Sequence, residues 1–232
     1  MIKIKKEKIY FLEKGSWSEE IYKRIVYYKN KKINKKNISV MLTGGNTAKE
    51  LYISWHSKKM FFKNNIKLFL TDERCTKPTS EKSNYYLIKK YLLDTKVIKS
   101  NEVCRIEAES ENIDLAMKKY LSLLPASIDI LFLSLASDGH IASIFPNSNL
   151  MTEDKKLINI TDRKQGGFYR ISISPLVIKR ARLVFIFVKG KERGKLLANN
   201  AKKNENLMPF NLINNGVCFL DKEASKAYKK QI

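Results

Sequence analysis

The chain has 232 residues, of which 44% are hydrophobic and 10% aromatic, and this composition excludes a disordered protein. Its length fits a single α/β domain over residues 1–232. The net charge of +22 raises the question of nucleic-acid binding. However, the lysines are spread among Asn and Ile residues, whose codons are equally A/T-rich, and no compact basic block accompanies them. We therefore expect no nucleic-acid partner and a positive field that favours anionic substrates.

The cysteines and the apolar runs indicate the cellular compartment in which we expect the protein. Cys75, Cys104 and Cys218 are far apart and form no CxxC pair, which predicts free thiols, a reducing compartment and no zinc site. The basic segment 1–8 is not followed by the apolar stretch of a secretory signal. The longest apolar run, 128–136, is too short to span a bilayer. We expect a cytoplasmic protein with no membrane partner, no metal and no cofactor.

Strands and helices alternate along the chain. Strands are expected, in order, at 9–12, 38–42, 66–71, 101–106, 128–136, 156–160, 169–174, 183–188 and 217–220. Helices are expected to open at 16–19, at 43–47, after 190–193 and at 221, and to span 81–93, 112–124 and 174–179. Their starts are marked by capping boxes at Ser16–Glu19 and Thr47–Glu50, by Ser174-Pro175 and by Asp221. The alternation predicts an α/β fold with an open, mostly parallel, Rossmann-like twisted sheet and helices on both faces.

Two polar turns follow expected strands, and each by itself has two interpretations. Gly44-Gly45 before a helix start presents backbone N–H groups to an anion, but the same glycines also suit a plain tight turn. Asp72-Glu73-Arg74 follows the strand at 66–71, and taken alone it is more typical of a surface loop.

The apolar strand at 128–136 stops at Ser137-Asp138-Gly139-His140. A continuous apolar run suits a strand covered on both faces, as in parallel sheets. His140 is one of two histidines and follows a glycine, which lets the backbone turn sharply. The other, His56, follows Trp55 on an expected helix and is expected at the surface. Because ligands bind where loops leave the carboxyl ends of strands in open α/β sheets, His140 is a candidate site residue.

Four polar clusters each follow an expected strand: the Gly-Gly turn, Asp72-Glu73-Arg74, Asp138-Gly139-His140, and the segment 190–193 that ends in Arg193. If those strands are parallel, all four clusters lie at the same edge of the sheet. Together they offer an anion-binding turn, two arginines and one imidazole. This set predicts a site for a phosphorylated small molecule with one general acid/base.

These residues resemble the 6-phosphogluconolactonase family, within the larger group that includes glucosamine-6-phosphate deaminases. Residues 43–48 are similar to the family's Ser-Gly-Gly-Ser-Thr-Pro, and residues 72–74 and 83–85 to its Asp-Glu-Arg and Ser-Asn-Tyr. The segment 137–146 resembles Pro-Asp-Gly-His-Thr-Ala-Ser-Leu-Phe-Pro and is the most specific match. Residues 170–173 and 190–193 resemble the family's Arg-Ile-Thr-Leu strand and Gly-x-x-Lys exit. The matches follow one another over most of the chain.

The resemblance implies hydrolysis of 6-phospho-D-glucono-1,5-lactone to 6-phosphogluconate, the second step of the oxidative pentose phosphate pathway, without a metal. His140 is the expected general base, which takes a proton from the attacking water and returns it to the ring oxygen. Arg74 and Arg193 are expected to hold the phosphate. The other expected substrate-binding residues are Gly44, Gly45, Asn46, Thr47, Asp72, Asp138, Gly139 and Arg170. Backbone N–H groups near the glycines are candidate oxyanion donors.

The chain departs from the family pattern at Asn46, where Ser is usual, at Arg193, where Lys is usual, and in the segment 162–168, which replaces a Pro- and Lys-rich loop. One alternative is a sugar-phosphate isomerase or deaminase, whose Asp-Gly-His motif continues with an acidic residue that 141–146 lacks. Another is a non-catalytic sugar-phosphate or nucleic-acid binding protein, which does not need His140 and Arg74 together with the Gly-Gly turn. The oligomeric state stays open, with a monomer favoured.

Overall fold

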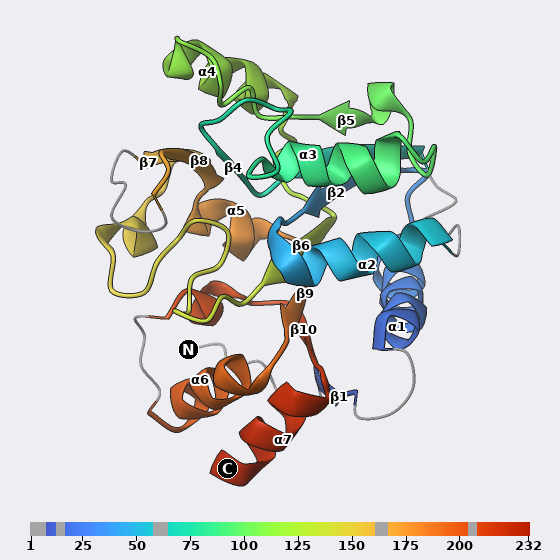
Figure 1. The fold of residues 1–232 in the computed structure, drawn as a ribbon, viewed down its shortest axis with the longest axis vertical. Coiled ribbons are helices and arrows are strands. Elements are labelled where there is room, and N and C mark those ends of the chain that lie inside the picture. Colours follow the sequence, from blue (N-terminus) through green and yellow to red (C-terminus); the bar gives the residue numbers. More distant parts are fainter. Residues whose placement is uncertain (1–7, 13–16, 58–64, 161–166, 204–207) are drawn as a thin grey trace.

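A computed structural model of the chain describes residues 8–12, 17–57, 65–160, 167–203 and 208–232. Its centre is a seven-stranded sheet in the order β1-β10-β9-β6-β2-β3-β5, in which every neighbouring pair is parallel (Figure 1). The strands are β1 (Ile9–Phe11), β2 (Asn37–Leu42), β3 (Asn65–Leu70), β5 (Val103–Cys104), β6 (Ile130–Ser134), β9 (Leu183–Val188) and β10 (Gly216–Leu220). The predicted open, mostly parallel α/β fold is confirmed.

Helices pack on this sheet from its two faces. They are α1 (Trp17–Lys32), α2 (Gly45–Ser57), α3 (Asn84–Ile88), α4 (Ile113–Leu123), α5 (Pro175–Arg180), α6 (Lys191–Lys203) and α7 (Lys222–Gln231). Every residue of β9 and of β10 is buried. Because successive residues of a strand point to opposite faces, both faces of the sheet are covered. Within the described residues, no helix combines the length and apolarity needed to cross a membrane.

A group of phenylalanines fills the middle of the core. Phe132 of β6 stacks on Phe185 and Phe187 of β9, with ring centroids 5.6 and 5.9 Å apart. Trp55 of α2 packs on the same Phe132, with a centroid distance of 5.5 Å. Such pairs add about 0.5–1.5 kcal/mol each beyond the burial of their surface. These contacts hold α2 against the strand from which His140 follows.

A second sheet of three antiparallel strands was not predicted. It has the order β4-β8-β7, with β4 (Asp72–Arg74), β8 (Arg170–Ile173) and β7 (Leu157–Ile160). The surface-loop interpretation, which residues 72–74 favoured when taken alone, is therefore wrong. Asp72 pairs with Ser172, and Arg74 with Arg170. The sequence around 72–74 does not predict this strand, because its formation depends on pairing with a segment about 100 residues away in the chain.

Two of the predicted helix caps are confirmed, and one is wrong. Ser174 and Asp221 are the N-caps of α5 and α7. Thr47 is not a cap, because α2 already begins at Gly45. Gly45 has a φ of +88°, which glycine adopts without steric cost and which lets the chain turn from β2 into α2.

The remaining differences concern helix and strand limits. The helix expected at 81–93 starts only at Asn84, where Ser83 accepts a hydrogen bond from the Tyr86 N–H, and it continues as a π-helical turn over Lys89–Leu93. The strand expected at 101–106 is reduced to β5 after a 3₁₀ turn. Ser16, in the first predicted capping box, lies outside the described residues. The cysteines are free thiols, as predicted.

Asp129 directly precedes β6, at the end of the strand opposite to His140, and its carboxylate binds several neighbouring groups. Its carboxylate accepts hydrogen bonds from Ser39 N at 3.0 Å and Lys35 Nζ at 2.8 Å, and it lies 3.3 Å from Arg182 Nε. Burial by itself would raise the pKa of Asp129, but the bonds from Lys35 and Ser39 outweigh burial and hold the pKa below its usual value.

This depressed pKa predicts how stability depends on pH. The unfolded carboxyl, with a pKa of about 3.9, takes up its proton before the folded one as pH falls. The Asp129 contribution is therefore complete above about pH 5 and is lost as pH falls through the folded-state pKa. In Asp129→Asn, the urea midpoint should depend less on pH below about pH 5 than in the wild type. Identical pH profiles for the two proteins would contradict this assignment.

Candidate active site

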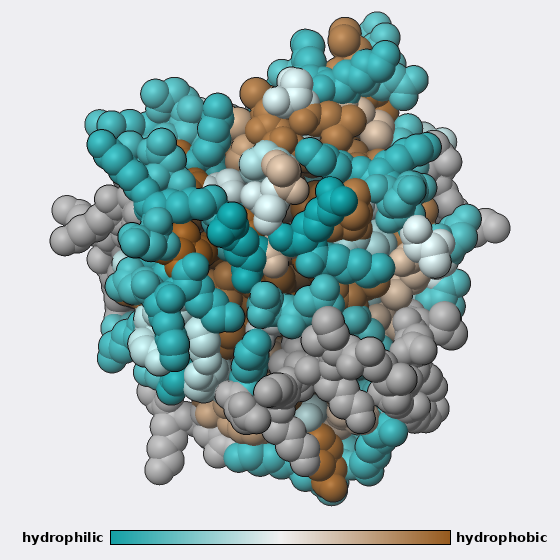
Figure 2. All heavy atoms as spheres, turned by 180° about the vertical axis from the view of Figure 1, so that it is seen from behind, coloured by the Kyte–Doolittle hydropathy of each residue, from teal (hydrophilic) through white to brown (hydrophobic). Residues whose placement is uncertain are grey.

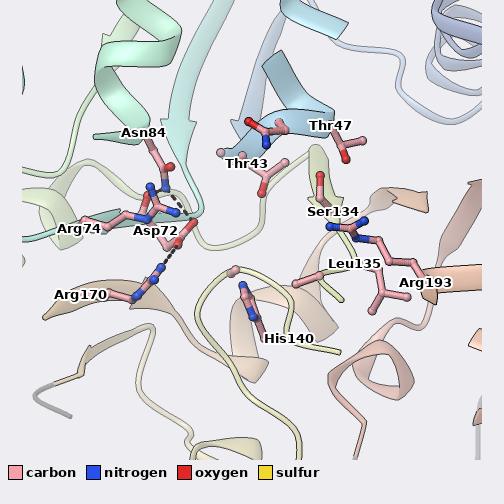
Figure 3. Close-up of a pocket in the computed structure, with 15 residues that line it drawn as sticks. Thr43, Thr47, Asp72, Arg74, Asn84, Ser134, Leu135, His140, Arg170 and Arg193 are labelled. Atoms are coloured by element: carbon pink, nitrogen blue, oxygen red, sulfur yellow. Dashed lines mark hydrogen bonds and ion pairs between the residues drawn. The ribbon is translucent and has the colours of Figure 1, made fainter. Parts of the chain in front are cut away.

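A polar pocket opens at the carboxyl ends of the central strands (Figure 3). From β2 the chain runs outward through β3 to β5, and it then returns to form β6 on the other side of β2. Ligands in open α/β sheets bind at such a reversal. The lining residues are Thr43, Gly44, Gly45, Asn46, Thr47, Asp72, Arg74, Asn84, Ser134, Leu135, Ala136, His140, Ala142, Arg170 and Arg193.

The four polar clusters expected at one edge of the sheet do meet in this pocket. Every residue predicted for the site lines it except Asp138 and Gly139. These two lie in the turn that carries His140. Gly139 has a φ of +90°, and a Cβ there would lie 2.6 Å from Met208 Cε. The positive φ favours glycine at this turn, whereas the Met208 methyl is the end of a flexible side chain that can move aside.

His140 is held by the carboxylate of Asp138. The Nδ1 atom of His140 lies 2.7 Å from Asp138 Oδ1, and the His140 ring packs on Phe145 with centroids 4.6 Å apart. A carboxylate is only an acceptor, so this contact favours the tautomer with the proton on Nδ1 and the lone pair on Nε2. The sequence did not predict this contact, because Asp138 was expected to bind the substrate.

The two acidic residues of β4, Asp72 and Glu73, form hydrogen bonds with protein groups around the pocket. Asp72 is buried and accepts hydrogen bonds from Ser143 Oγ at 2.7 Å and Thr71 Oγ1 at 2.9 Å. Glu73 accepts bonds from the N–H groups of Asn84 and Tyr85 at the start of α3. Burial raises the pKa of Glu73, while its hydrogen bonds act in the opposite direction. Both carboxylates order the segments that carry Arg74 and Asn84.

Asn84 is a pocket residue that the sequence did not select. Its Nδ2 donates to the Asp72 carbonyl at 2.9 Å, and a Cβ on Gly44 would lie 1.8 Å from its Oδ1. The first glycine of the turn therefore makes room for Asn84, in addition to shaping the turn. The Ser83-Asn84-Tyr85 motif was the available signal. The other unselected lining residues, Thr43, Ser134, Leu135, Ala136 and Ala142, carry no charge, and only Thr43 and Ala142 lie in segments that match the family pattern.

Three arginines lie on two sides of the pocket. Figure 3 shows Arg74 and Arg170 together with Asp72 on one side, Arg193 on the other, and His140 between them. Arg170 Nη1 lies 3.8 Å from Asp72 Oδ2; burial lowers the pKa of Arg170, and Asp72 opposes this. Arg193 Nη1 donates to the Lys189 carbonyl at 3.0 Å. The negative charge of Asp72 thus partly neutralises the positive charge of Arg170. Arg193, in contrast, is bonded to a neutral carbonyl group.

The described part of the chain shows no cluster of metal ligands. Within it, no group of three or more His, Cys, Asp or Glu side chains is placed to hold an ion. The second histidine, His56, is exposed near the end of α2, as predicted.

Comparison with known proteins then assigns the family. Residues 13–220 match the family model described as glucosamine-6-phosphate isomerases/6-phosphogluconolactonase. The chain belongs to this family. The 6-phosphogluconolactonase of Thermotoga maritima is 30% identical over 196 residues, which cover 82% of this chain and 86% of that protein. The 6-phosphogluconolactonase of Treponema pallidum is 26% identical over 181 residues, which cover 73% and 74%.

Solved structures of the family share this fold. The crystal structure of the Thermotoga maritima 6-phosphogluconolactonase superposes with a TM-score of 0.81 at 26% identity, covering 92% of this chain and 99% of that one. A monomeric glucosamine-6-phosphate deaminase superposes with a TM-score of 0.73 at 14% identity, covering 95% and 99%. A lactonase and a deaminase therefore share this fold, and the fold alone does not choose between the two activities.

Proposed function

We propose that the protein hydrolyses 6-phospho-D-glucono-1,5-lactone to 6-phospho-D-gluconate. The observation that carries the proposal is one imidazole, backed by a carboxylate 2.7 Å away, in a pocket with arginines on two sides. The imidazole suits proton transfer from the attacking water to the leaving oxygen, and the arginines suit a phosphate. The names of the relatives, 6-phosphogluconolactonase, support this substrate.

In the proposed mechanism, Nε2 of His140 accepts a proton from water as the water oxygen attacks the C1 carbonyl carbon. Asp138 keeps Nδ1 protonated and stabilises the imidazolium that forms. The tetrahedral intermediate then collapses, the bond between C1 and the ring oxygen breaks, and the imidazolium returns the proton to that oxygen. The charge on the C1 oxygen needs hydrogen-bond donors, for which we propose the backbone N–H of Gly44, ahead of the start of α2, and those of the turn that carries His140.

The phosphate is assigned to the side of the pocket that holds Arg193 and the start of α2. The N-terminus of a helix attracts anions through its free N–H groups and its dipole. Gly45, Asn46 and Thr47 form this start, and all three line the pocket. On the opposite side, Asp72 lies beside Arg170, and its negative charge makes binding of the phosphate there less favourable. This changes the expected role of Arg74, which is now a contact to the sugar part of the substrate.

The deaminase alternative is disfavoured by the residues that follow His140. Ring opening of an amino-sugar phosphate by that branch uses an acidic residue soon after its Asp-Gly-His motif, and the segment 141–146 has none. In this chain Ala142 lines the pocket and Ser143 is buried and bonded to Asp72. A second proton-transfer group is therefore lacking at this position.

The proposed reaction is tested by adding the purified protein to freshly generated 6-phosphogluconolactone. We expect product to form well above the spontaneous rate of hydrolysis, measured in the same buffer without protein. Glucosamine 6-phosphate is the comparison substrate, for which we expect no ammonia release. A rate equal to spontaneous hydrolysis would reject the lactonase, and ammonia release would select the deaminase.

The net charge of +22 predicts that association with an anionic substrate depends on salt. Figure 2 shows hydrophilic side chains over much of one face of the molecule. We expect kcat/KM for the lactone to fall by roughly tenfold between about 20 mM and about 300 mM salt, because ions screen the field of the protein. The rate for unphosphorylated glucono-1,5-lactone is the control and should vary much less. Equal salt dependence for both lactones would contradict steering of the phosphate.

A further inference from the structure

Ser134 is the last residue of β6, and its side chain lines the pocket. Its Oγ atom is buried and has no hydrogen-bond partner among the described residues. Figure 3 shows the hydroxyl on the same side of the pocket as Thr47 and Arg193. Nearly all buried polar groups in proteins have a partner, and an unsatisfied one destabilises the fold. The position of this hydroxyl is therefore unfavourable for folding alone.

The strand holds Ser134 in place. It pairs with Phe187 of β9, and the next residue, Leu135, donates its N–H to the Phe187 carbonyl at 3.0 Å. Leu133 and Leu135 on either side are buried in the core. The backbone at this position is thus fixed on both sides, so the hydroxyl remains directed toward the pocket.

A second donor on this side of the pocket is also unsatisfied. Arg193 Nη1 is bonded to the Lys189 carbonyl, but the buried Nε of Arg193 has no partner within the described part of the chain. The start of α2 adds backbone N–H groups and the positive end of a helix dipole. A hydroxyl, a guanidinium and a helix start together match an anion that accepts several hydrogen bonds, as a phosphate does.

We propose that Ser134 is a further substrate-binding residue, whose hydroxyl donates a hydrogen bond to a phosphate oxygen held at the Arg193 side of the pocket. This inference rests on the proposed function and adds a residue that determines preference for a phosphorylated substrate. The same hydroxyl destabilises the ligand-free protein and strengthens binding. These two opposite effects distinguish the Ser134 hydroxyl from a buried hydroxyl that stabilises the folded protein through a hydrogen bond.

The test measures binding and stability of Ser134→Ala against the wild type. Inorganic phosphate and the product 6-phosphogluconate are titrated into each protein by calorimetry, and the melting temperature is recorded without ligand. We expect affinity for both ligands to fall by about 10- to 100-fold, the range for a hydrogen bond to a charged group. The melting temperature should rise, because an unsatisfied buried hydroxyl has been removed. In the lactonase assay, KM should rise with kcat nearly unchanged.

Two variants serve as controls. Ser134→Thr keeps the hydroxyl and should retain most of the phosphate affinity. Ser225→Ala removes a buried hydroxyl that donates to the Leu220 carbonyl, so it should lower the melting temperature and leave phosphate affinity unchanged. Unchanged phosphate affinity in Ser134→Ala, or no phosphate binding by the wild type, would overturn the inference.

The inference and the proposed function fail in different ways. If the wild type binds phosphate through Ser134 but does not hydrolyse the lactone, the phosphate site stands and the reaction is rejected. If the wild type hydrolyses the lactone and Ser134→Ala binds phosphate equally well, the reaction stands and the role of Ser134 is rejected.

Discussion

Replacement of His140 by alanine is expected to lower kcat for 6-phosphogluconolactone by roughly 10²- to 10⁴-fold, the range for loss of a general acid/base. The reason is that no water molecule is then deprotonated as it attacks, and the departing ring oxygen receives no proton. Binding of the substrate does not need the imidazole, so KM should change little. The measurement is steady-state hydrolysis corrected for the spontaneous rate, which sets the lowest activity that can be detected.

The chain offers a matched control in its other histidine. His56 is exposed near the end of α2 and lies outside the pocket, so His56→Ala should keep wild-type kcat. Asp138→Asn tests the partner of the imidazole and should give a smaller loss of kcat than His140→Ala, because Asp138 acts through the orientation and charge of the ring. A His140→Ala protein with near wild-type kcat would remove His140 from the mechanism.

Replacement of Arg193 by alanine is expected to raise KM by about 10- to 100-fold, with a much smaller change in kcat. The physical reason is the loss of a charge-assisted hydrogen bond to the phosphate, worth about 1.5–3 kcal/mol. The phosphate is remote from the reacting C1 atom, so its contacts act mainly through binding. Unphosphorylated glucono-1,5-lactone lacks the group that Arg193 binds, and its KM should be the same in both proteins.

Arg193→Lys separates charge from geometry. The family usually has lysine here, and Arg193 is oriented by the bond from Nη1 to the Lys189 carbonyl. An ammonium group supplies the charge but cannot make the planar, forked contact of a guanidinium. We expect a KM between those of the wild type and Arg193→Ala. A KM for Arg193→Ala equal to that of the wild type would show that the phosphate lies elsewhere, with Arg74 and Arg170 as the next residues to replace.

The sequence by itself determined the fold class and most of the residues in the pocket. The runs in β6 and β9 are continuously apolar, which is typical of strands covered on both faces, and polar turns with glycine follow the strands. Parallel strands bring the residues that follow them to the same edge of the sheet. For this reason His140 and Arg193 could be placed in one site before the structure was known.

The tertiary structure decided what depends on partners that are distant in the chain. Asp72-Glu73-Arg74 became a strand because β8 pairs with it, and Asn84 entered the pocket because Glu73 and Asp72 bind the start of α3 and its side chain. Both segments match short family motifs, but these motifs do not report the pairing of β4 with β8 or the hydrogen bonds to α3, which depend on the folded chain.

The roles of uncharged residues were also decided by the tertiary structure. Ser134 is one serine among many in the sequence, and only its burial without a partner, in a pocket that Arg193 also lines, distinguishes it. Composition and periodicity report which face of a strand is buried. They do not report whether a hydrogen bond is satisfied, because that depends on atoms from several elements that come together only in the folded chain.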